Sequence, residues 1–354
     1  MVSYGPAHNR SPSSRILAQI GFGAGDLGRG VGDAYLRRRI ITETEMDRIN
    51  GLHHVTMVAS KAGANNAFYT GALGLRRVKT TVNFDAPDVY HLYYGDELGR
   101  PGSVMTSFPF PNAARGKRGT GEASMTAFAV PEGSLPAWEE RLAPLGPTTR
   151  ETFLGEERLL MEGPDGESLA LVEVAGDARE PWTGGGVDAG IAVRGFHSVT
   201  LALRDAGATA DLLRLMGYEE EAREGAVTRM RLSGGNGADV VDLHEDAGAP
   251  PAVQSAGSVH HVAFSVADRA AQDAVRRRLA EAGFSTTPSI DRDYFWAIYF
   301  RTPGGVLFEV ATDEPGFARD EAPGALGTAL KLPARHAHLR DRLARELEPL
   351  EGLA

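Results

Sequence analysis

The stretch GLHHVTM, residues 51–57, places two histidines side by side at the start of an alternating apolar segment. The same pattern returns far downstream as SVHHVAFSV, residues 258–266. Alternation with a period of two is typical of a β-strand with one buried face. The chain has ten histidines, and these two stretches use four of them. The recurrence predicts two equivalent strands of an internal repeat, each beginning with a histidine pair.

Four similar units follow one another from Gly51 onward. Each has a leading strand with period-two alternation, then a helix with period 3.6, then short strands, with Gly and Pro at the joints. The leading strands are HHVTMVA, SMTAFAV, FHSVTLAL and HHVAFSV. This pattern predicts an α+β fold built from four repeated modules. If the histidine pairs share one site, module one pairs with module four, and modules two and three pair around a second, metal-free cavity.

The composition divides the chain into segments. We expect modules one and two in residues 50–175 and modules three and four in residues 193–312, joined by a Gly-rich linker over residues 176–192. Residues 313–354 are expected to form a tail, in which LPARHAHLRDRLARELEPL makes one exposed helix. Residues 1–49 are rich in Gly, Ser and Arg, and we interpret them as an extension that is either disordered or upstream of the true start.

The extension has two features of its own. Met46 is the candidate start of the organised part of the chain. The stretch GAGDLG, residues 23–28, matches the G-x-G-x-x-G pattern of dinucleotide-binding loops. That pattern needs a strand before it and a βαβ unit around it, and no second parallel strand follows before Gly51. We therefore expect no nucleotide site there.

The overall composition excludes several classes of function. The 354 residues carry a net charge of −10 without a basic cluster, so a nucleic-acid partner is not expected. Cysteine is absent, which excludes disulfides, thiolate metal sites and cysteine nucleophiles. No apolar run approaches the ~20 residues of a membrane span, and the N-terminus lacks a continuous apolar signal region. We therefore expect a cytoplasmic protein without membrane contact.

The faces of the two leading strands sort the four histidines. Alternate residues of a strand share a face, so His54 lies on the side of Thr56, and His261 lies on the corresponding side of its own strand. By the same rule, His53 and His260 point to the opposite face. The second histidine of each pair is therefore the candidate that faces a common site.

A glutamate completes this candidate site. Glu309 lies within GVLFEVAT, an otherwise apolar strand of module four, where an ionised carboxylate is costly unless it is paired or bound to a metal. Modules two and three carry Met125 and Ser198 at the histidine position. At the glutamate position the other modules carry Thr106 or Met105, Ala170 or Leu171, and Asp242. Two imidazoles and one carboxylate converge only if modules one and four face each other.

His54, His261 and Glu309 form a two-His-one-carboxylate set with open coordination positions, which is the pattern of non-haem Fe(II) oxygenases. Three protein ligands hold the metal, and the free positions admit a chelating substrate and O₂. The simpler alternative is that each histidine pair begins a strand and is solvated or capped. The repeated pair, together with the glutamate, favours the metal site. Both Fe(II) and Mn(II) suit these ligands, so the sequence leaves the choice between them open.

From about Gly51 to Leu350 the chain resembles the vicinal oxygen chelate superfamily, and within it the ring-cleaving dioxygenases of the hydroquinone branch. The resemblance rests on GLHHVTM, YHLYYGDELGRPGSVMTSFPF, RGFHSVT, IDRDYFWAIYFRTPGGVLFEVATD and the tail stretch LPARHAHLRDRL. It implies the vicinal oxygen chelate fold, an α+β fold of four βαβββ modules whose mixed sheets form two open barrels. It assigns the iron ligands to the second histidine of each pair and to the glutamate. It also implies a catalytic group around the metal, consisting of Arg292, Tyr299, Thr56, His53 and His260.

Other interpretations of these residues stay open at the level of sequence. Arg292 could form a loop salt bridge with Asp291 or Asp293, and Tyr299 could belong to the core of its aromatic-rich strand. Thr56 shares the face of the ligands and is the better candidate for a hydrogen-bond partner. We expect aromatic neighbours such as Tyr294, Phe295 or Trp296 to line a ring pocket, and we assign His91 and His197 structural roles.

The resemblance implies an Fe(II)-dependent, extradiol-type dioxygenase that opens the ring of a hydroquinone or catechol and incorporates both atoms of O₂. Its partners would be a small aromatic substrate and O₂, and a homo-oligomer is left open. One alternative is a glyoxalase-like metal-dependent isomerase or lyase, which usually needs a fourth ligand that neither Thr106 nor Met105 supplies well. Another is a non-enzymatic protein that binds an aromatic drug, which would not need all three metal-ligand candidates.

Overall fold

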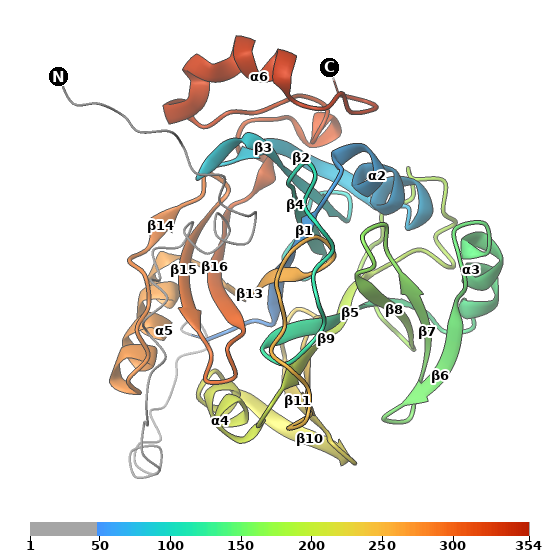
Figure 1. Cartoon of the computed structure of the whole chain (residues 1–354), viewed down its shortest axis with the longest axis vertical. Coiled ribbons are helices and arrows are strands. Elements are labelled where there is room, and N and C mark those ends of the chain that lie inside the picture. The colour runs from blue at the N-terminus through green and yellow to red at the C-terminus, as the bar shows by residue number, and fades with distance from the viewer. Residues whose placement is uncertain (1–47, 354) are drawn as a thin grey trace.

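Two eight-stranded mixed sheets form the body of the molecule in the computed structural model, which describes residues 48–353 (Figure 1). The expectations for the N-terminal extension, including Met46 and GAGDLG, therefore lie outside the described residues. In spatial order the first sheet contains β14 (Ile290–Asp291), β15 (Phe295–Arg301), β16 (Leu307–Pro315), β13 (Val259–Val266), β1 (Leu52–Ala59), β4 (Val104–Pro109), β3 (Ala86–Gly95) and β2 (Arg76–Asn83). The second contains β10 (Tyr218–Glu224), β11 (Val227–Leu232), β12 (Val240–Glu245), β9 (Gly195–Leu203), β5 (Glu122–Pro131), β8 (Ser168–Val174), β7 (Glu156–Glu162) and β6 (Thr149–Phe153).

Each sheet is built from two modules that meet at its centre. Within module one the first strand pairs in parallel with the last, β1 with β4, and module four repeats this with β13 and β16. The two modules join through the antiparallel pair of β1 and β13. Modules two and three join in the same way through β5 and β9. The predicted α+β fold and the predicted pairing of modules are confirmed.

The outermost strands are the ones that the sequence pattern marks least clearly. The strands β6 and β10 have the sequences TRETF and YEEEARE, and most of their residues are exposed or half-buried. A strand at the edge of a sheet has little apolar surface to bury and therefore lacks the alternation that marks the central strands. These two strands, which complete modules two and three, consequently lack a strong sequence signal of their own.

One helix of each module follows its leading strand, as predicted. The longest begins after Asp268, whose side chain accepts a hydrogen bond from the backbone of Ala271, an N-cap that satisfies one free N–H of the first turn. Its buried residues Ala271, Val275 and Leu279 recur every four positions and pack against the first sheet. The four helices are α2 (Ala62–Asn66), which continues into a π-helical turn (Ala67–Ala72), α3 (Leu135–Leu142), α4 (Gly207–Leu215) and α5 (Arg269–Glu281).

The main core decides which side chains face the inside of each barrel. On β16, Phe308 and Val310 belong to a hydrophobic cluster that extends through both sheets, whereas Leu307 and Ala311 belong to a smaller cluster on the other face. Glu309 alternates with Phe308 and Val310 and so lies on the face of the smaller cluster. Burial of Phe308 and Val310 in the large hydrophobic cluster thus fixes which face of β16 points into the barrel, and Glu309 lies on that face.

The C-terminal tail differs from the single exposed helix that the sequence predicts. A 3₁₀ segment (Ala334–Leu339) precedes a short helix, α6 (Arg340–Glu346), and both lie over the end of the first sheet near β2 and β3 (Figure 1). Leu343 of α6 is fully buried, and the Glu348 carboxylate accepts hydrogen bonds from the first backbone N–H groups of α2. The prediction is wrong because these contacts with module one bend the tail and cover one of its faces.

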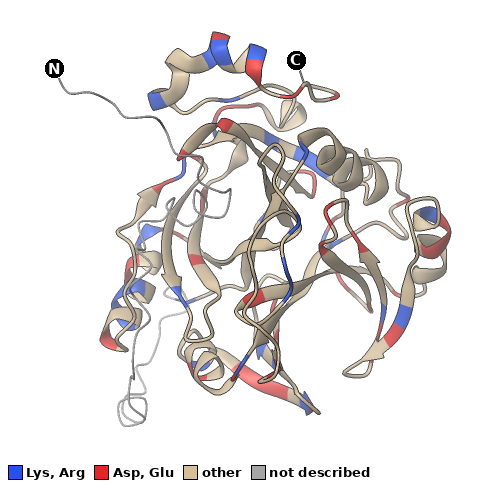
Figure 2. Cartoon of the chain, viewed as in Figure 1, with Lys and Arg blue, Asp and Glu red and all other residues tan. Residues whose placement is uncertain are grey.

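Positive and negative side chains occur together on two of the helices. Along α5 and α6, Arg residues are interspersed with Asp and Glu (Figure 2). None of the helices within residues 48–353 is long and apolar enough to span a bilayer.

Candidate metal centre

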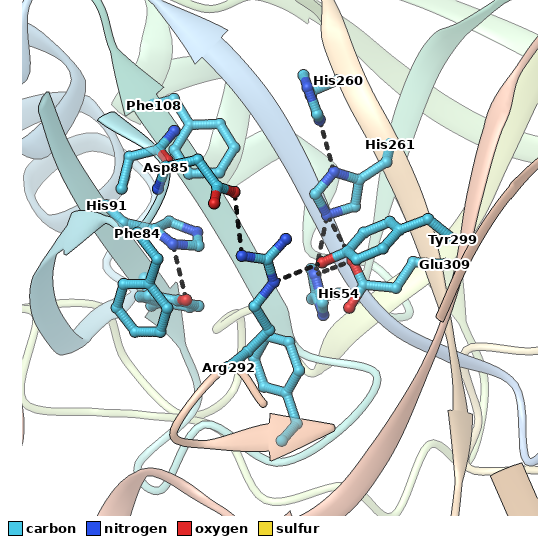
Figure 3. A pocket seen from close by; sticks show the side chains of 13 residues that line it. His54, Phe84, Asp85, His91, Phe108, His260, His261, Arg292, Tyr299 and Glu309 are labelled. Carbon is cyan, nitrogen blue, oxygen red and sulfur yellow. Dashed lines mark hydrogen bonds and ion pairs between the residues drawn. The ribbon is translucent and has the colours of Figure 1, made fainter. Parts of the chain in front are cut away.

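Three side chains from three neighbouring strands meet inside the first barrel. His54 comes from β1, His261 from β13 and Glu309 from β16, and all three are at most 3 % exposed. The Nε2 atoms of the two histidines are 3.1 Å apart. Oε2 of Glu309 is 2.9 Å from Nε2 of His261 and 3.5 Å from Nε2 of His54 (Figure 3). We call this group the His-His-Glu triad. The structure therefore brings the three candidate ligands together.

A β-bulge at each histidine pair explains why both members lie near the site. Leu52 pairs with Phe264 and His54 with Ala263, so His53 is an extra residue on β1, and the register shifts in the same way at His260 on β13. A bulge interrupts the alternation and re-aims the side chains around it. The prediction that His53 and His260 point to the opposite face is therefore wrong.

The outer histidines instead contact the inner ones. Nδ1 of His53 is 2.9 Å from Nδ1 of His54, and Nδ1 of His260 is 2.7 Å from Nδ1 of His261. If each inner ring donates its Nδ1–H to the outer ring, its Nε2 carries a free lone pair directed into the triad. A hydrogen bond of this kind fixes both the tautomer and the orientation of a metal-binding imidazole.

Glu309 provides the test of whether a metal fits the triad. Both of its carboxylate oxygens are buried, and neither has a hydrogen-bond partner among residues 48–353. Its close neighbours are the Nε2 atoms of His54 and His261, which are acceptors in the tautomer described above. Three acceptors that face one another need a cation between them. The donor set therefore fits a divalent metal ion.

The protonation states are consistent with such a site. Burial lowers the pKa of His261, and the interaction with Glu309 opposes this only in part. For Glu309, burial acts against ionisation, but positive charge and N–H donation from His54 and His261, when these rings rather than a metal ion face it, outweigh burial and hold its pKa well below the usual value. Burial, together with the neighbouring His54, lowers the pKa of His53 to about 3. Neutral imidazoles and an ionised carboxylate are the forms that bind metals.

A pocket opens beside the triad, and two further predicted residues line it. Arg292 donates from Nε to the hydroxyl of Tyr299 at 3.2 Å and from Nη1 to Asp85 at 3.1 Å (Figure 3). The alternative of a salt bridge to a neighbouring aspartate of its own loop is not what the structure shows, since Asp85 belongs to module one. Burial works against the charge of Arg292, but Tyr299, Asp85 and Glu309 raise its pKa, so it stays a cation.

Tyr299 lies directly opposite Glu309 in the register of β15 and β16. Burial raises the pKa of its hydroxyl, although Arg292 opposes the rise, so the group is a neutral phenol at pH 7. The alternative of a purely structural core residue does not describe it, because it lines the pocket and is hydrogen-bonded to Arg292. It is thus a proton donor held between a fixed cation and the triad.

Thr56 is a predicted residue that does not line the pocket. Its hydroxyl is 2.8 Å from that of Thr106, which is 3.0 Å from Nε2 of His91, and Nδ1 of His91 is 2.8 Å from the hydroxyl of Tyr93. His91 and Tyr93 line the pocket, whereas Thr56 and Thr106 do not. The structural role assigned to His91 is therefore incomplete. The alternation in VYHLYYG places His91 and Tyr93 on one face and is the signal that could have found them.

Of the three aromatic residues that we expected to line the ring pocket, Phe295 does so. Its ring centre is 5.0 Å from that of His54. Tyr294 instead packs against Phe317, and Trp296 lies under the guanidinium of Arg269. On β15 Trp296 follows Phe295 and so points to the opposite face, whereas Tyr294 precedes the strand.

The comparisons with known proteins agree with this geometry. Residues 51–310 match the family model described as "Glyoxalase/Bleomycin resistance protein/Dioxygenase superfamily". The chain is 40% identical over 303 residues to "Putative ring-cleaving dioxygenase MhqO" of Bacillus subtilis, covering 85% of this chain and 96% of that protein. It is 36% identical over 312 residues to "Chlorohydroquinone/hydroquinone 1,2-dioxygenase" of Sphingobium indicum, covering 85% and 97%.

Solved structures show the same relationship. A crystal structure of a "putative dioxygenase" from Bacillus subtilis superposes with a TM-score of 0.83 at 39% identity, covering 86% of this chain and 99% of the other. Glyoxalase I from Zea mays shares the fold alone, with a TM-score of 0.54 at 15% identity over 74% and 92% of the two chains. The predicted vicinal oxygen chelate resemblance is thus confirmed, and the chain belongs to the Glyoxalase/Bleomycin resistance protein/Dioxygenase superfamily.

Proposed function

We propose that the protein is an Fe(II)-dependent, extradiol-type dioxygenase that opens the ring of a hydroquinone or a catechol. The observation that carries this proposal is the His-His-Glu triad, which presents three metal-binding atoms at the bottom of a pocket and leaves the remaining coordination positions to ligands. The name of the Sphingobium indicum relative supports a hydroquinone as substrate. The cytoplasmic location and the oligomeric state stay predictions.

The lack of a fourth protein ligand weighs against a glyoxalase-like isomerase or lyase. Among the described residues, no further His, Asp or Glu joins the triad. Thr106 occupies the position in module one that corresponds to Glu309, and its hydroxyl is already bonded to Thr56 and His91. A protein that only sequesters an aromatic drug would not need a buried carboxylate without a hydrogen-bond partner. Both alternatives are therefore less well supported than the dioxygenase.

Fe(II) bound by the triad would supply the redox chemistry that allows an aromatic diol to react with O₂. His53 and His260 keep the inner rings in the tautomer that directs Nε2 toward the metal position. Arg292 places a permanent positive charge at the pocket and stabilises negative charge that develops on oxygen during the reaction. Tyr299 offers a phenolic proton within reach of the same region and is held there by Arg292.

The walls of the pocket suit a flat ring. Phe295, Phe84 and Phe108 line it together with the polar groups described above. Aromatic side chains pack against a substrate ring in stacked or edge-to-face arrangements and exclude water from the reacting atoms. The pocket thereby combines an apolar surface for the ring with charged and hydrogen-bonding groups for its oxygens.

Oxygen uptake after anaerobic reconstitution tests the proposal. Protein loaded with Fe(II) or with Mn(II) is mixed with hydroquinone or catechol in an oxygen electrode, and the product is analysed after reaction under ¹⁸O₂. We expect one O₂ consumed per ring opened, with both labelled atoms in the product. Metal binding without O₂ uptake, combined with isomerisation of a glutathione hemithioacetal, would establish the glyoxalase-like alternative instead.

A further inference from the structure

Asn83 is a buried polar residue in the pocket wall that the proposed reaction has not used. It is the last residue of β2, its side chain lines the same pocket as the triad, and it is 2 % exposed. Its Oδ1 accepts hydrogen bonds from the backbone N–H groups of Asp85 at 2.9 Å and Ala86 at 3.2 Å. Both partners are donors, so the atom that faces them must be the carbonyl oxygen, and the orientation of the amide is fixed.

The other end of this amide has no partner. Nδ2 of Asn83 is buried and makes no hydrogen bond to any residue in the range 48–353. Folded proteins leave few buried N–H groups unpaired, because such a group loses its bonds to water and gains nothing in return. A donor of this kind in a pocket wall is explained if the missing acceptor arrives with a ligand.

Asn83 lines the pocket on the side that carries Asp85. Arg292 stands between Asp85 on one side and Tyr299 on the other, and Tyr299 adjoins the triad (Figure 3). The side chain of Asn83 accepts a hydrogen bond from the backbone of Asp85, and it therefore lies on the Asp85 side of Arg292. The carboxylate of Asp85 is paired with Arg292, so it does not present an uncompensated negative charge to a ligand oxygen nearby. The pocket thus has polar groups on the side of Asn83 and Asp85 as well as at the triad, and Phe84, Phe108 and Phe295 also line it.

We propose that Nδ2 of Asn83 binds the second oxygen of the substrate, across the ring from the oxygen at the triad, and thereby selects 1,4-dihydroxybenzenes over 1,2-dihydroxybenzenes. This inference rests on the proposed function and assigns its substrate class to one residue. In a 1,4-diol the two oxygens lie at opposite ends of the ring, so both sets of polar groups in the pocket are used. In a 1,2-diol both oxygens lie at the triad, and Nδ2 stays unpaired at the cost described above.

Asn83→Asp tests the inference on the protein side. The substitution keeps an acceptor for the turn but replaces the donor with a second acceptor. We expect kcat/KM for hydroquinone to fall about 10- to 100-fold, the range for one lost hydrogen bond at a buried site, while kcat/KM for catechol changes less than about threefold. Asn112→Asp, which adds the same charge at an exposed position outside the pocket, should change neither value. A melting curve of each variant checks the fold.

A pair of ligands tests the same inference without any substitution. Under anaerobic conditions 4-methoxyphenol and 4-ethylphenol bind to the Fe(II)-loaded wild-type protein in a calorimeter. The two phenols have similar size, but the first alone carries an acceptor oxygen opposite its hydroxyl. We expect the methoxy compound to bind about tenfold more tightly, and we expect Asn83→Asp to abolish this preference. Equal Kd values for the wild-type protein would overturn the inference.

The outcomes separate this inference from the proposed function. If the wild-type protein opens both rings and Asn83→Asp loses activity equally on both, Asn83 does not select the substrate, and the dioxygenase assignment stands. If the wild-type protein neither binds the phenols nor consumes O₂ with hydroquinone or catechol, the proposed function is wrong, and the role of Asn83 is overturned with it.

Discussion

Glu309 in the first sheet and Asp242 in the second occupy the same place in the fold. Each lies on the strand beside a leading strand, and each is fully buried. Opposite Glu309 on the outer neighbouring strand is Tyr299, whereas opposite Asp242 is Arg229. The guanidinium of Arg229 binds both oxygens of Asp242, at 2.7 and 2.9 Å. The second carboxylate therefore has a cation supplied by the chain itself, and the first does not.

The backbone of the two sites is the same. The second sheet has a bulge at Ser124 on β5 and another at His197 on β9, at the positions that correspond to His53 and His260. His197 contacts Glu156 at 3.2 Å, and Glu156 in turn pairs with Arg229. The comparison teaches that this place in the fold buries an acid in both sheets, and that the local side chains decide whether a guanidinium pairs with it or whether it faces two imidazoles in a candidate metal site.

The strongest test of this comparison removes the triad. His54→Ala, His261→Ala and Glu309→Ala should each abolish ring cleavage, because two protein ligands are too few to hold the metal tightly, while the fold is kept. Iron content by plasma emission, O₂ uptake and a melting curve measure the three properties on the same preparations. Full iron occupancy in all three variants would refute the assignment of the triad.

The corresponding change in the second sheet should affect stability instead of activity. Arg229→Met leaves Asp242 buried without a cation, which should lower the free energy of unfolding by about 3–5 kcal/mol. The double variant Arg229→Met/Asp242→Leu removes the buried charge as well and should recover most of the loss. Urea denaturation measures both. An unchanged stability of the single variant would show that Asp242 does not depend on Arg229.

Arg292 is the cation of the first pocket, and unlike Arg229 it does not form an ion pair with the buried acid of its sheet. Arg292→Ala should keep the iron but lower turnover by roughly 10²–10³, the effect of removing one preorganised donor. Arg292→Lys should recover only part of this, because an ammonium group lacks the planar fork. Tyr299→Phe should cost less and change the pH profile if the hydroxyl moves a proton.

Iron content and steady-state O₂ consumption of these variants must be measured together. Wild-type turnover in Arg292→Ala would mean that the residue only ties Asp85 to the loop of module four.

The histidines at the bulges provide a matched pair of variants. His260→Ala removes the group that orients His261, so the affinity for Fe(II) should fall about 10- to 100-fold. His197→Ala changes the equivalent residue of the second sheet and should leave that affinity unchanged. Competition with a chelator under anaerobic conditions measures both. Equal losses would show that the two bulges do not differ in function.

The smallest expected effect concerns pH and the second sheet. Burial opposes ionisation of Glu156, but His197 and Arg229 lower its pKa to about 2. Its contribution to stability is therefore complete above the unfolded pKa of about 4.3 and is lost as the pH falls through 2. Glu156→Gln should lower the unfolding free energy by about 1 kcal/mol at pH 7 and by progressively less below pH 4. A difference in unfolding free energy between the wild-type protein and the variant that stays constant down to pH 2 would contradict this.

The sequence predicts the central strands and the triad because both depend on local periodicity. Period-two alternation in the leading strands and in GVLFEVAT is sufficient to place His54, His261 and Glu309 on facing surfaces once modules one and four are paired. The alternation of residues in one strand does not reveal a bulge, because a bulge depends on the register with the partner strand. Alternation alone therefore places His53 and His260 on the wrong face.

The rest of the pocket could not be predicted for a related reason. Asn83 ends β2 and Asp85 lies in the turn that follows, and they reach the site only because that turn approaches Arg292 across the barrel. The tail holds this turn as well, since Arg335 and His336 both bond to the carbonyl oxygen of Phe84. Contacts between segments so far apart in the chain leave no periodic pattern in either segment.

The order in which the chain closes its two sheets has a consequence for folding. His54 and His261 are 207 residues apart, and the pairing of β5 with β9 closes a much shorter loop that is nested inside the pairing of β1 with β13. Loop-closure entropy grows with loop length, and contacts between distant residues form late and slowly. A chain still emerging from the ribosome holds His54 long before it holds His261 and Glu309. The proposed metal site is thus complete only after the first sheet has closed, and an unfinished chain lacks two of its three candidate ligands.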